Sequence, residues 1–245
     1  MVTLYVSGLT YNVDGKAILN NISFKFEGGL LTIIGPNGSG KTTLLKAITG
    51  LLSDVRGEVL IDGKSPSRYR PNMAYVPAQP SLDPMARPID IAMAMNYASG
   101  GPWRERFSRT LRLLGVNEED RELSTMSSGE QRLVLIAAAL SKLPQALILD
   151  EPTAFLDITN QVKVLSLLRD LASSGRLVVM ATHDLIYAPM ADAVALLSHG
   201  SLLAFGRPDD VLSEELLSSA YGIRVLRVGG ATSLFVPELA VKRFF

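Results

Sequence analysis

The stretch Gly35-Pro36-Asn37-Gly38-Ser39-Gly40-Lys41-Thr42 decides the fold of this chain. It fits the pattern G-x-x-x-x-G-K-[ST], and it lies between an apolar, strand-like run at 30–34 and a helix-like run at 42–52. A strand, a glycine-rich loop and a helix in this order form a phosphate-binding loop. The glycines let the backbone curl around a phosphate chain, and the N–H groups at the start of the helix face the anion. We therefore expect a nucleoside triphosphate to bind here.

Two side chains at the end of this loop have expected roles of their own. Lys41 adds a positive charge for the β- and γ-phosphates, and the Thr42 hydroxyl is a ligand for Mg²⁺. The alternative is a glycine-rich turn that merely joins a strand to a helix. The flanking strand and helix favour the phosphate-binding interpretation.

Length and composition set limits on the class of protein. A chain of 245 residues forms one large α/β domain with a subdomain, or two modest domains. The 24 basic residues balance the 24 acidic ones, which argues against nucleic acid as the main partner but leaves a local basic patch open. The absence of cysteine excludes disulfides and thiol–metal sites.

Membrane and export signals are weak in this sequence. Residues 1–5 show neither a charged leader nor the start of a long apolar core, so we expect no signal peptide. The longest apolar run, 133–140, is too short to cross a bilayer. We expect that the chain does not form a membrane pore by itself.

The pattern of apolar residues predicts an α/β fold. Alternating apolar strands and helices indicate a mainly parallel sheet that is covered on both faces, preceded by a β-rich segment at 1–29 and interrupted by a helical insertion at 81–142. The expected strands are 3–10, 17–26, 30–34, 58–61, 73–76, 146–149, 177–181, 193–197 and 201–205. The expected helices are 42–52, 89–98, 103–114, 131–140, 158–173 and 185–190, with another that starts at Pro208.

Two carboxylates follow the buried run 146–149. In an open parallel sheet, ligands bind beyond the carboxyl ends of the strands, where Asp150 and Glu151 would lie. Asp150 would hold Mg²⁺, directly or through water, and Glu151 would act as general base for the attacking water. The alternative, two surface acids that cap the next helix, is the weaker interpretation beside Lys41 and Thr42.

A second turn of small residues, Ser127-Ser128-Gly129-Glu130-Gln131, begins another helix. Such a turn is a potential phosphate-binding site. Taken alone, it is an ordinary helix cap.

Together these motifs resemble, in order and spacing and over nearly the whole chain, the ATP-binding subunit of ABC transporters. Residues 35–43 are similar to the Walker A motif, 126–130 to the LSGGQ signature, and 146–151 to Walker B with its catalytic glutamate. Residues 153–157 resemble the D-loop and 181–184 the segment with the switch histidine, while Tyr11 stands where the family has an adenine-stacking aromatic.

The resemblance implies a set of site residues and one fold. The catalytic residues would be Lys41, Gln79, Glu151 and His183, and the Mg²⁺ ligands Thr42, Gln79 and Asp150. ATP would bind to Tyr11, Gly35, Pro36, Asn37, Gly38, Ser39, Gly40, Lys41, Thr42 and Thr43, with Ser127, Ser128, Gly129, Glu130 and Asp157 completing the site. The fold would be a single P-loop ATPase domain over 1–245. Its core would comprise 1–80 and 143–245 with an N-terminal antiparallel β subdomain, and its helical subdomain 81–142 would precede the signature helix.

The chain departs from the family pattern at several positions. Ala78 occupies the place of the Q-loop glutamine, with Gln79 one residue later. Ser128 replaces the first signature glycine, Glu130 the glutamine and Ala154 the D-loop serine. The departures remove no group that the expected chemistry requires, although the choice between Ala78 and Gln79 stays open.

The resemblance also implies partners and a direction of transport. Two copies would pair head to tail, so that each ATP lies between Walker A of one copy and the signature turn of the other. The tail, 199–223, resembles ATPases of iron-chelate, haem and cobalamin importers. Separate permease subunits and an extracytoplasmic binding protein would complete the transporter, with the chain peripheral on the cytoplasmic face of the membrane. An exporter ATPase, an importer of other metals or oxyanions, and a soluble ABC ATPase acting on DNA or ribosomes are the alternatives.

Overall fold

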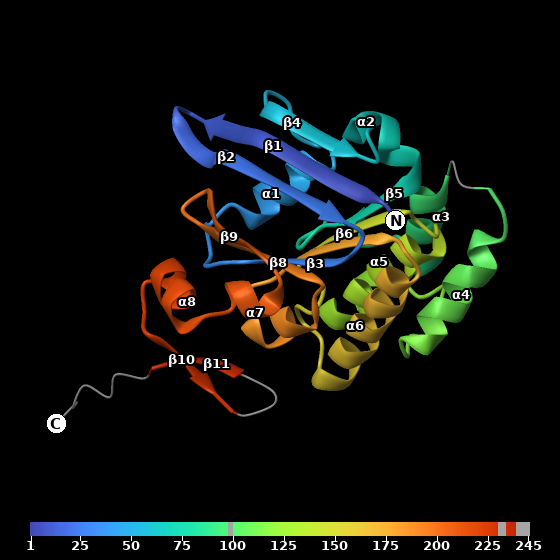
Figure 1. Cartoon of the computed structure of the whole chain (residues 1–245). Helices are drawn as coiled ribbons and strands as arrows, with labels where there is room; N and C mark the ends of the chain where they lie inside the picture. The colour runs from blue at the N-terminus through green and yellow to red at the C-terminus, as the bar shows by residue number, and fades with distance from the viewer. Residues whose placement is uncertain (98–99, 230–233, 239–245) are drawn as a thin grey trace.

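A computed structural model describes residues 1–97, 100–229 and 234–238, and a six-stranded sheet forms its centre (Figure 1). The strand order is β5-β6-β7-β3-β8-β9, and every neighbouring pair is parallel except β8 and β9. The strands are β3 (Gly29–Ile34), β5 (Met73–Val76), β6 (Ala146–Asp150), β7 (Leu177–Ala181), β8 (Ala193–Ser198) and β9 (Ser201–Gly206). The mainly parallel sheet expected from the sequence is confirmed.

Both faces of this sheet are covered. Alternate residues of the central strands enter two separate cores, as Leu30 and Leu31 of β3 do, because successive side chains of a strand point to opposite faces. On one face lie helix α1 (Lys41–Ile48) and the N-terminal strands; on the other lie α5 (Ser128–Ser141) and α6 (Ile158–Ser173). Burial on both faces explains why these strands are apolar runs without alternation.

An antiparallel sheet of three strands, in the order β2-β1-β4, lies over α1 (Figure 1). Its strands are β1 (Thr3–Val13), β2 (Lys16–Glu27) and β4 (Arg56–Ile61). Asp14 and Gly15 form the two-residue turn between β1 and β2, both with positive φ, as a turn matching the twist of the strands requires. Phe24 of β2 stacks on Phe205 of β9 with ring centroids 5.1 Å apart, which joins this sheet to the central one.

The segment after β5 is helical, as expected. Helices α3 (Pro88–Asn96) and α4 (Trp103–Leu113) pack together with α5 at one side of the molecule (Figure 1). The predicted end of α3 at Ala98 lies outside the described residues. Short helical turns lie between the longer elements: α2 (Pro66–Tyr69) and the 3₁₀ turn Arg70–Asn72 precede β5, and the 3₁₀ turn Leu123–Thr125 precedes α5. The proposed boundaries of the helical subdomain, 81 and 142, stay a prediction.

Several expected boundaries differ from the structure. Helix α1 ends at Ile48, four residues before the predicted end, because Gly50 turns the chain with a φ of 68°. Helix α5 starts at Ser128, three residues before the predicted start, since Ser127 caps it. The segment Leu185–Met190 is a 3₁₀ helix that contains Pro189.

The last part of the chain includes a hairpin that the sequence did not predict. After α7 (Pro208–Val211) and α8 (Glu214–Tyr221), strands β10 (Val225–Val228) and β11 (Leu234–Pro237) pair antiparallel. Phe235 and Val236 of β11 line a cavity of about 460 Å³ together with His183, Asp184 and the start of the 3₁₀ helix. The hairpin therefore lies beside the expected switch histidine.

Candidate functional site

The loop between β3 and α1 has the backbone that the glycine pattern predicts. Gly35 has a φ of 150°, and a Cβ there would lie 2.2 Å from the Leu197 carbonyl oxygen. Gly40, with a φ of 100°, precedes α1, and a Cβ on it would lie 2.9 Å from a Leu19 methyl carbon. Both positions exclude a side chain, because a Cβ would need left-handed backbone and would meet neighbouring atoms. The loop is therefore fixed by glycine between β8 and β2.

Lys41 is held against this loop. The residue is buried, and its Nζ donates to the carbonyl oxygens of Gly35 at 2.7 Å and Pro36 at 3.1 Å. Burial lowers the pKa of Lys41, while the nearby charges of Glu151 and Asp150 raise it in part. The two carboxylates thus favour the charged ammonium that phosphate binding needs.

Thr42 and Asp150 meet across the site. The Thr42 hydroxyl donates to Oδ2 of Asp150 at 2.7 Å, joining the start of α1 to the end of β6. Burial raises the pKa of Asp150, and the hydrogen bond from Thr42 opposes that shift. A hydroxyl and a carboxylate side by side are hard oxygen ligands of the kind that Mg²⁺ takes, with water in its other positions. These two residues fit the metal that the sequence implies.

Glu151 and His183 form the next pair. Nδ1 of His183 lies 3.0 Å from Oε2 of Glu151, and the histidine side chain is 64% exposed whereas that of Glu151 is 19% exposed. Glu151 has a φ of 50°, an uncommon value for a residue with a side chain. Its N–H donates to the Ala181 carbonyl oxygen at 2.9 Å. The ends of β6 and β7 thus bring together the two residues expected to act on the attacking water and the γ-phosphate.

A cavity of about 510 Å³ opens in front of the loop. Glu151 forms one wall, and the other lining residues are Lys16, Ile18, Asn37, Gly38, Ser39, Gly40, Lys41, Thr42 and Thr43. Tyr11, the expected adenine-stacking residue, does not line this cavity. Lys16 and Ile18 of β2 line it instead, and the sequence analysis did not single them out. Stacking of Tyr11 on adenine stays a prediction.

The signature turn is a reciprocal helix cap. The Ser127 hydroxyl accepts from the Glu130 N–H at 3.2 Å, and Oε2 of Glu130 accepts from the Ser127 N–H at 2.8 Å. The backbone hydrogen bond from Ser127 is the main cause that lowers the pKa of Glu130, and Arg121 contributes to the lowering. Glutamate at position 130 is therefore explained by capping. Ser127 and Ser128 remain exposed at the start of a 14-residue helix.

The other expected site residues lie outside the cavity in front of the loop. Asp157 caps α6, where its Oδ1 accepts from the Asn160 N–H at 2.7 Å. Gln79 and Ala78 line a smaller cavity of about 190 Å³ with residues of α5 and with Phe155. Neither residue lines the cavity in front of the loop, and the part of Gln79 in metal binding stays a prediction.

Sequence reasoning missed Arg132, which is 3% exposed. Its guanidinium donates to the carbonyl oxygens of Pro77 and Asp150, and to that of Glu151 at 2.7 Å. Burial lowers the pKa of Arg132 to about 10, which leaves the group charged at neutral pH. The available signal was that Arg132 is a charged residue directly before the apolar run 133–140 of the same helix.

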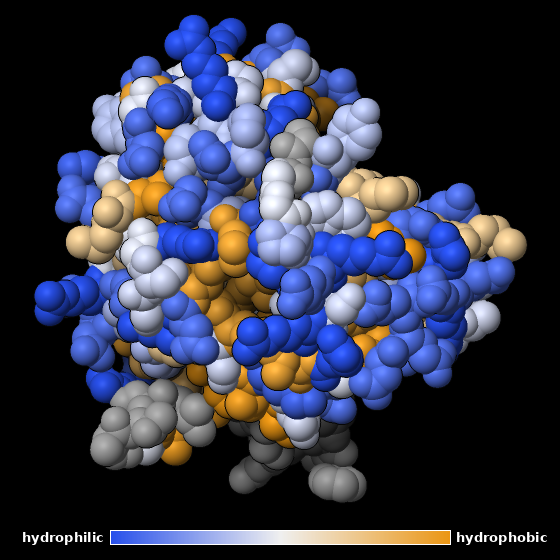
Figure 2. Space-filling model, turned by 90° about the vertical axis from the view of Figure 1, so that its right-hand side faces the viewer, coloured by the Kyte–Doolittle hydropathy of each residue, from blue (hydrophilic) through white to orange (hydrophobic). Residues whose placement is uncertain are grey.

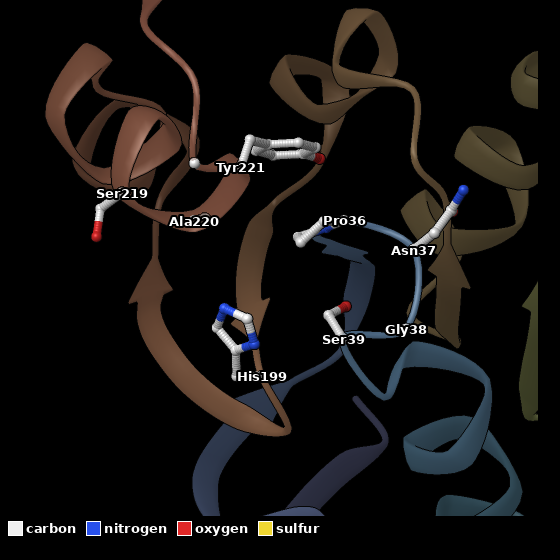
Figure 3. A pocket seen from close by; sticks show the side chains of 9 residues that line it. Pro36, Asn37, Gly38, Ser39, His199, Ser219, Ala220 and Tyr221 are labelled. Atoms are coloured by element: carbon white, nitrogen blue, oxygen red, sulfur yellow. The ribbon is translucent and has the colours of Figure 1, made fainter.

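A further cavity lies behind the loop. It measures about 310 Å³ and is lined by residues 36–39, by His199 and by residues 219–222. In Figure 3, Tyr221 reaches over Pro36 and His199 faces the loop near Ser39. His199 is exposed, as expected for a surface residue, with a φ of 47° in the turn between β8 and β9.

The fold and this site define a nucleoside triphosphatase with a phosphate-binding loop: a lysine and helix N-terminus for the phosphates, oxygen ligands for a metal, and a carboxylate for water. A family model described as "ABC transporter" matches residues 19–154. The chain belongs to the ABC transporter family, and it is an ATPase. The resemblance seen in the motifs is confirmed.

Known relatives cover most of the chain. It is 37% identical over 238 residues to the hemin import ATP-binding protein HmuV of Roseobacter denitrificans, covering 90% of this chain and 91% of the relative. It is 32% identical to the manganese transport system ATP-binding protein MntB of Bacillus subtilis, covering 92% and 94%. It is 34% identical to the cobalamin import ATP-binding protein BtuD of Halobacterium salinarum, covering 91% of this chain and 60% of the relative.

Solved structures share the fold. An inward-facing putative metal-chelate type ABC transporter superposes with a TM-score of 0.80 at 25% identity, covering 97% of this chain and 98% of that one. A dimeric ATP-binding cassette, MJ0796, bound to ADP and phosphate, superposes with a TM-score of 0.76 at 26% identity, covering 84% and 98%. Within the described ranges, this chain has no helix with the length and apolar character to cross a membrane.

Proposed function

We propose that this chain powers uptake of a metal chelate, of the iron-siderophore, haem or cobalamin type, through separate transmembrane subunits. One observation carries the ATPase part: Lys41, Thr42, Asp150, Glu151 and His183 converge on one side of the phosphate-binding loop. The hemin and cobalamin importers among the relatives and the metal-chelate type transporter among the structures support the cargo. The manganese system among the relatives supports a bare metal ion as a second candidate.

We assign the catalytic steps to residues of this site. The loop N–H groups and Lys41 bind the β- and γ-phosphates of ATP. Thr42 and Asp150 would hold Mg²⁺, which would supply positive charge against the charge that develops on the phosphates. Glu151 accepts a proton from the attacking water, and His183, within hydrogen-bond distance of Glu151, orients the γ-phosphate. Hydrolysis then yields ADP and phosphate.

A second copy would complete the site. Ser127 and Ser128 are exposed at the start of α5, and neither they nor Gly129 line the cavity in front of the loop of their own chain. In a head-to-tail pair this helix N-terminus would reach the triphosphate of the partner, since such an end attracts anions. The dimeric cassette among the solved structures supports pairing of two copies.

The permease would contact the helical segment. This segment has exposed apolar side chains: Met85 is 67% exposed, Met93 on α3 is 54% exposed and Tyr97 is 92% exposed. Figure 2, which views the side where α3 and α4 lie, shows apolar areas among polar residues. Binding to a permease would hold the chain at the cytoplasmic face of the membrane.

The test is to look for a permease gene beside the gene of this chain and to reconstitute the two proteins together. The complex in liposomes, with ATP on the side of this chain, should take up one of haem, cobalamin or a ferric chelate, and the Glu151→Gln complex should not. Uptake of free Mn²⁺ alone would overturn the proposed cargo, and transport into the compartment that mimics the exterior would overturn the proposed direction. Wild-type protein without ATPase activity would overturn the catalytic assignment.

A further inference from the structure

We infer that Arg132 is a positioning residue that holds the catalytic carboxylate from the signature helix. The inference rests on the proposed role of Glu151 as general base. Arg132 lies on α5 three residues after Gly129 of the signature turn, yet its guanidinium lies behind the ends of β5 and β6. One side chain of the signature helix thus reaches two other motifs, the loop at Pro77 and the Walker B segment at Asp150 and Glu151.

The contacts fix the peptide of Glu151 from both sides. Its N–H donates to the Ala181 carbonyl oxygen at 2.9 Å, and its carbonyl oxygen accepts from Arg132 at 2.7 Å. Between these bonds the residue has a φ of 50°, which a residue with a side chain keeps only when its surroundings hold it there. Loss of the Arg132 bond would let this backbone relax and move the carboxylate.

The same guanidinium also reaches the loop that carries Gln79. It donates to the carbonyl oxygen of Pro77, two residues before Gln79, and Arg132 and Gln79 line the same small cavity. A guanidinium is suited to this task because its planar fork serves several acceptors at fixed angles. A lysine offers a point charge without that geometry.

Burial makes the arrangement rigid. Arg132 is 3% exposed and remains charged, so its three hydrogen bonds to carbonyls are charge-assisted and shielded from water. Any shift of the start of α5, for instance when the signature turn engages ATP, moves the anchor of this side chain. The geometry therefore couples the signature helix to Glu151.

The experiment compares Arg132→Met, which keeps a long side chain but removes the fork and the charge, with Arg132→Lys. With full-length protein, kcat for ATP hydrolysis should fall about 100-fold in Arg132→Met, as for a catalytic group displaced by about 1 Å. The Kd for a fluorescent ATP analogue should change less than about 3-fold, since the phosphate loop is untouched. The kcat of Arg132→Lys should lie between the kcat of Arg132→Met and that of the wild type.

Arg106→Met is the matched control. Nε of Arg106 also donates to a carbonyl of α5, that of Ser141 at 2.8 Å, but at the end of the helix far from the site. This variant should keep the wild-type kcat. If Arg132→Met does not fold, the Arg132→Lys protein carries the test: a kcat equal to wild type would overturn the inference.

A double-mutant comparison separates positioning from general support of the fold. If Arg132 acts through Glu151, Arg132→Met combined with Glu151→Gln should be as slow as Glu151→Gln alone, because coupled residues are not additive. Multiplied losses would overturn the inference. A wild-type protein that hydrolyses ATP, with Glu151→Gln inactive and Arg132→Met normal, refutes this inference but leaves the proposed function standing.

Discussion

Gly129→Ala perturbs the contact between the signature helix and the D-loop. A Cβ on Gly129 would lie 2.7 Å from the carbonyl oxygen of Phe155, a backbone atom in a residue that itself has a φ of 65°. A carbon and an oxygen need about 3.3 Å, so the two segments must separate by roughly 0.6 Å. The start of α5 would therefore move relative to the loop that follows Glu151.

The effect on stability combines two opposing terms. Overpacking costs about 1–3 kcal/mol, whereas replacing glycine by alanine in a helix gains about 0.5–1 kcal/mol. The net loss is then about 1 kcal/mol, which for a chain of this length lowers Tm by about 2–4 °C. Because the displaced turn is the one proposed to reach ATP on the partner, the ATPase rate should fall by about 10-fold or more.

The assay is a thermal melt together with steady-state phosphate release at saturating ATP. Gly100→Ala is the control, since no atom lies within 4 Å of its added Cβ and its φ is not positive. A Gly129→Ala protein with the Tm and rate of the Gly100→Ala protein would show that the close approach to Phe155 does not exist.

Three further outcomes follow from the site. Lys41→Ala should lose ATP binding or turnover because it removes the buried ammonium at the loop, and normal kinetics in phosphate release would contradict its role. Glu151→Gln should bind ATP but hydrolyse it about 100-fold to 10,000-fold more slowly, and light scattering should detect a stable dimer with ATP; an unchanged rate would refute the general-base assignment. Burial raises the pKa of Asp150, so the folded protein holds the proton of this carboxyl more tightly than the unfolded chain does. The free energy of unfolding therefore falls as pH rises above about 4. Asp150→Asn, which keeps an acceptor for Thr42, should gain stability relative to wild type between pH 4 and pH 7 in urea unfolding, and a constant difference would refute this.

The sequence predicted the bounds of a helix or strand correctly where a capping residue or a proline marks its end. The strand 73–76 and the helix 158–173 have the predicted bounds, since proline follows the first and Asp157 caps the second. The end of α1 was missed although Gly50 marks it, because the apolar pattern continues to Leu52.

The site was predictable where one short segment supplies both geometry and chemistry, as in the phosphate loop. Arg132 was missed because its hydrogen bonds go to carbonyl oxygens that are remote in sequence, such as that of Pro77. No local sequence pattern marks such acceptors. The hairpin at the C-terminal side was missed for a similar reason: its strands bury little of their own surface and lie against the segment at His183. Pairing and docking of this kind depend on distant residues.

The two hydrogen bonds of Lys41 have a consequence for nucleotide binding. The ammonium of Lys41 donates to the Gly35 and Pro36 carbonyl oxygens and so stabilises the conformation of the phosphate loop. The same cation also attracts the phosphates of the ligand. Ordering such a side chain on binding would cost about 0.5–1.5 kcal/mol, and here folding has already met that cost. The phosphate-binding loop is therefore preorganised for a triphosphate.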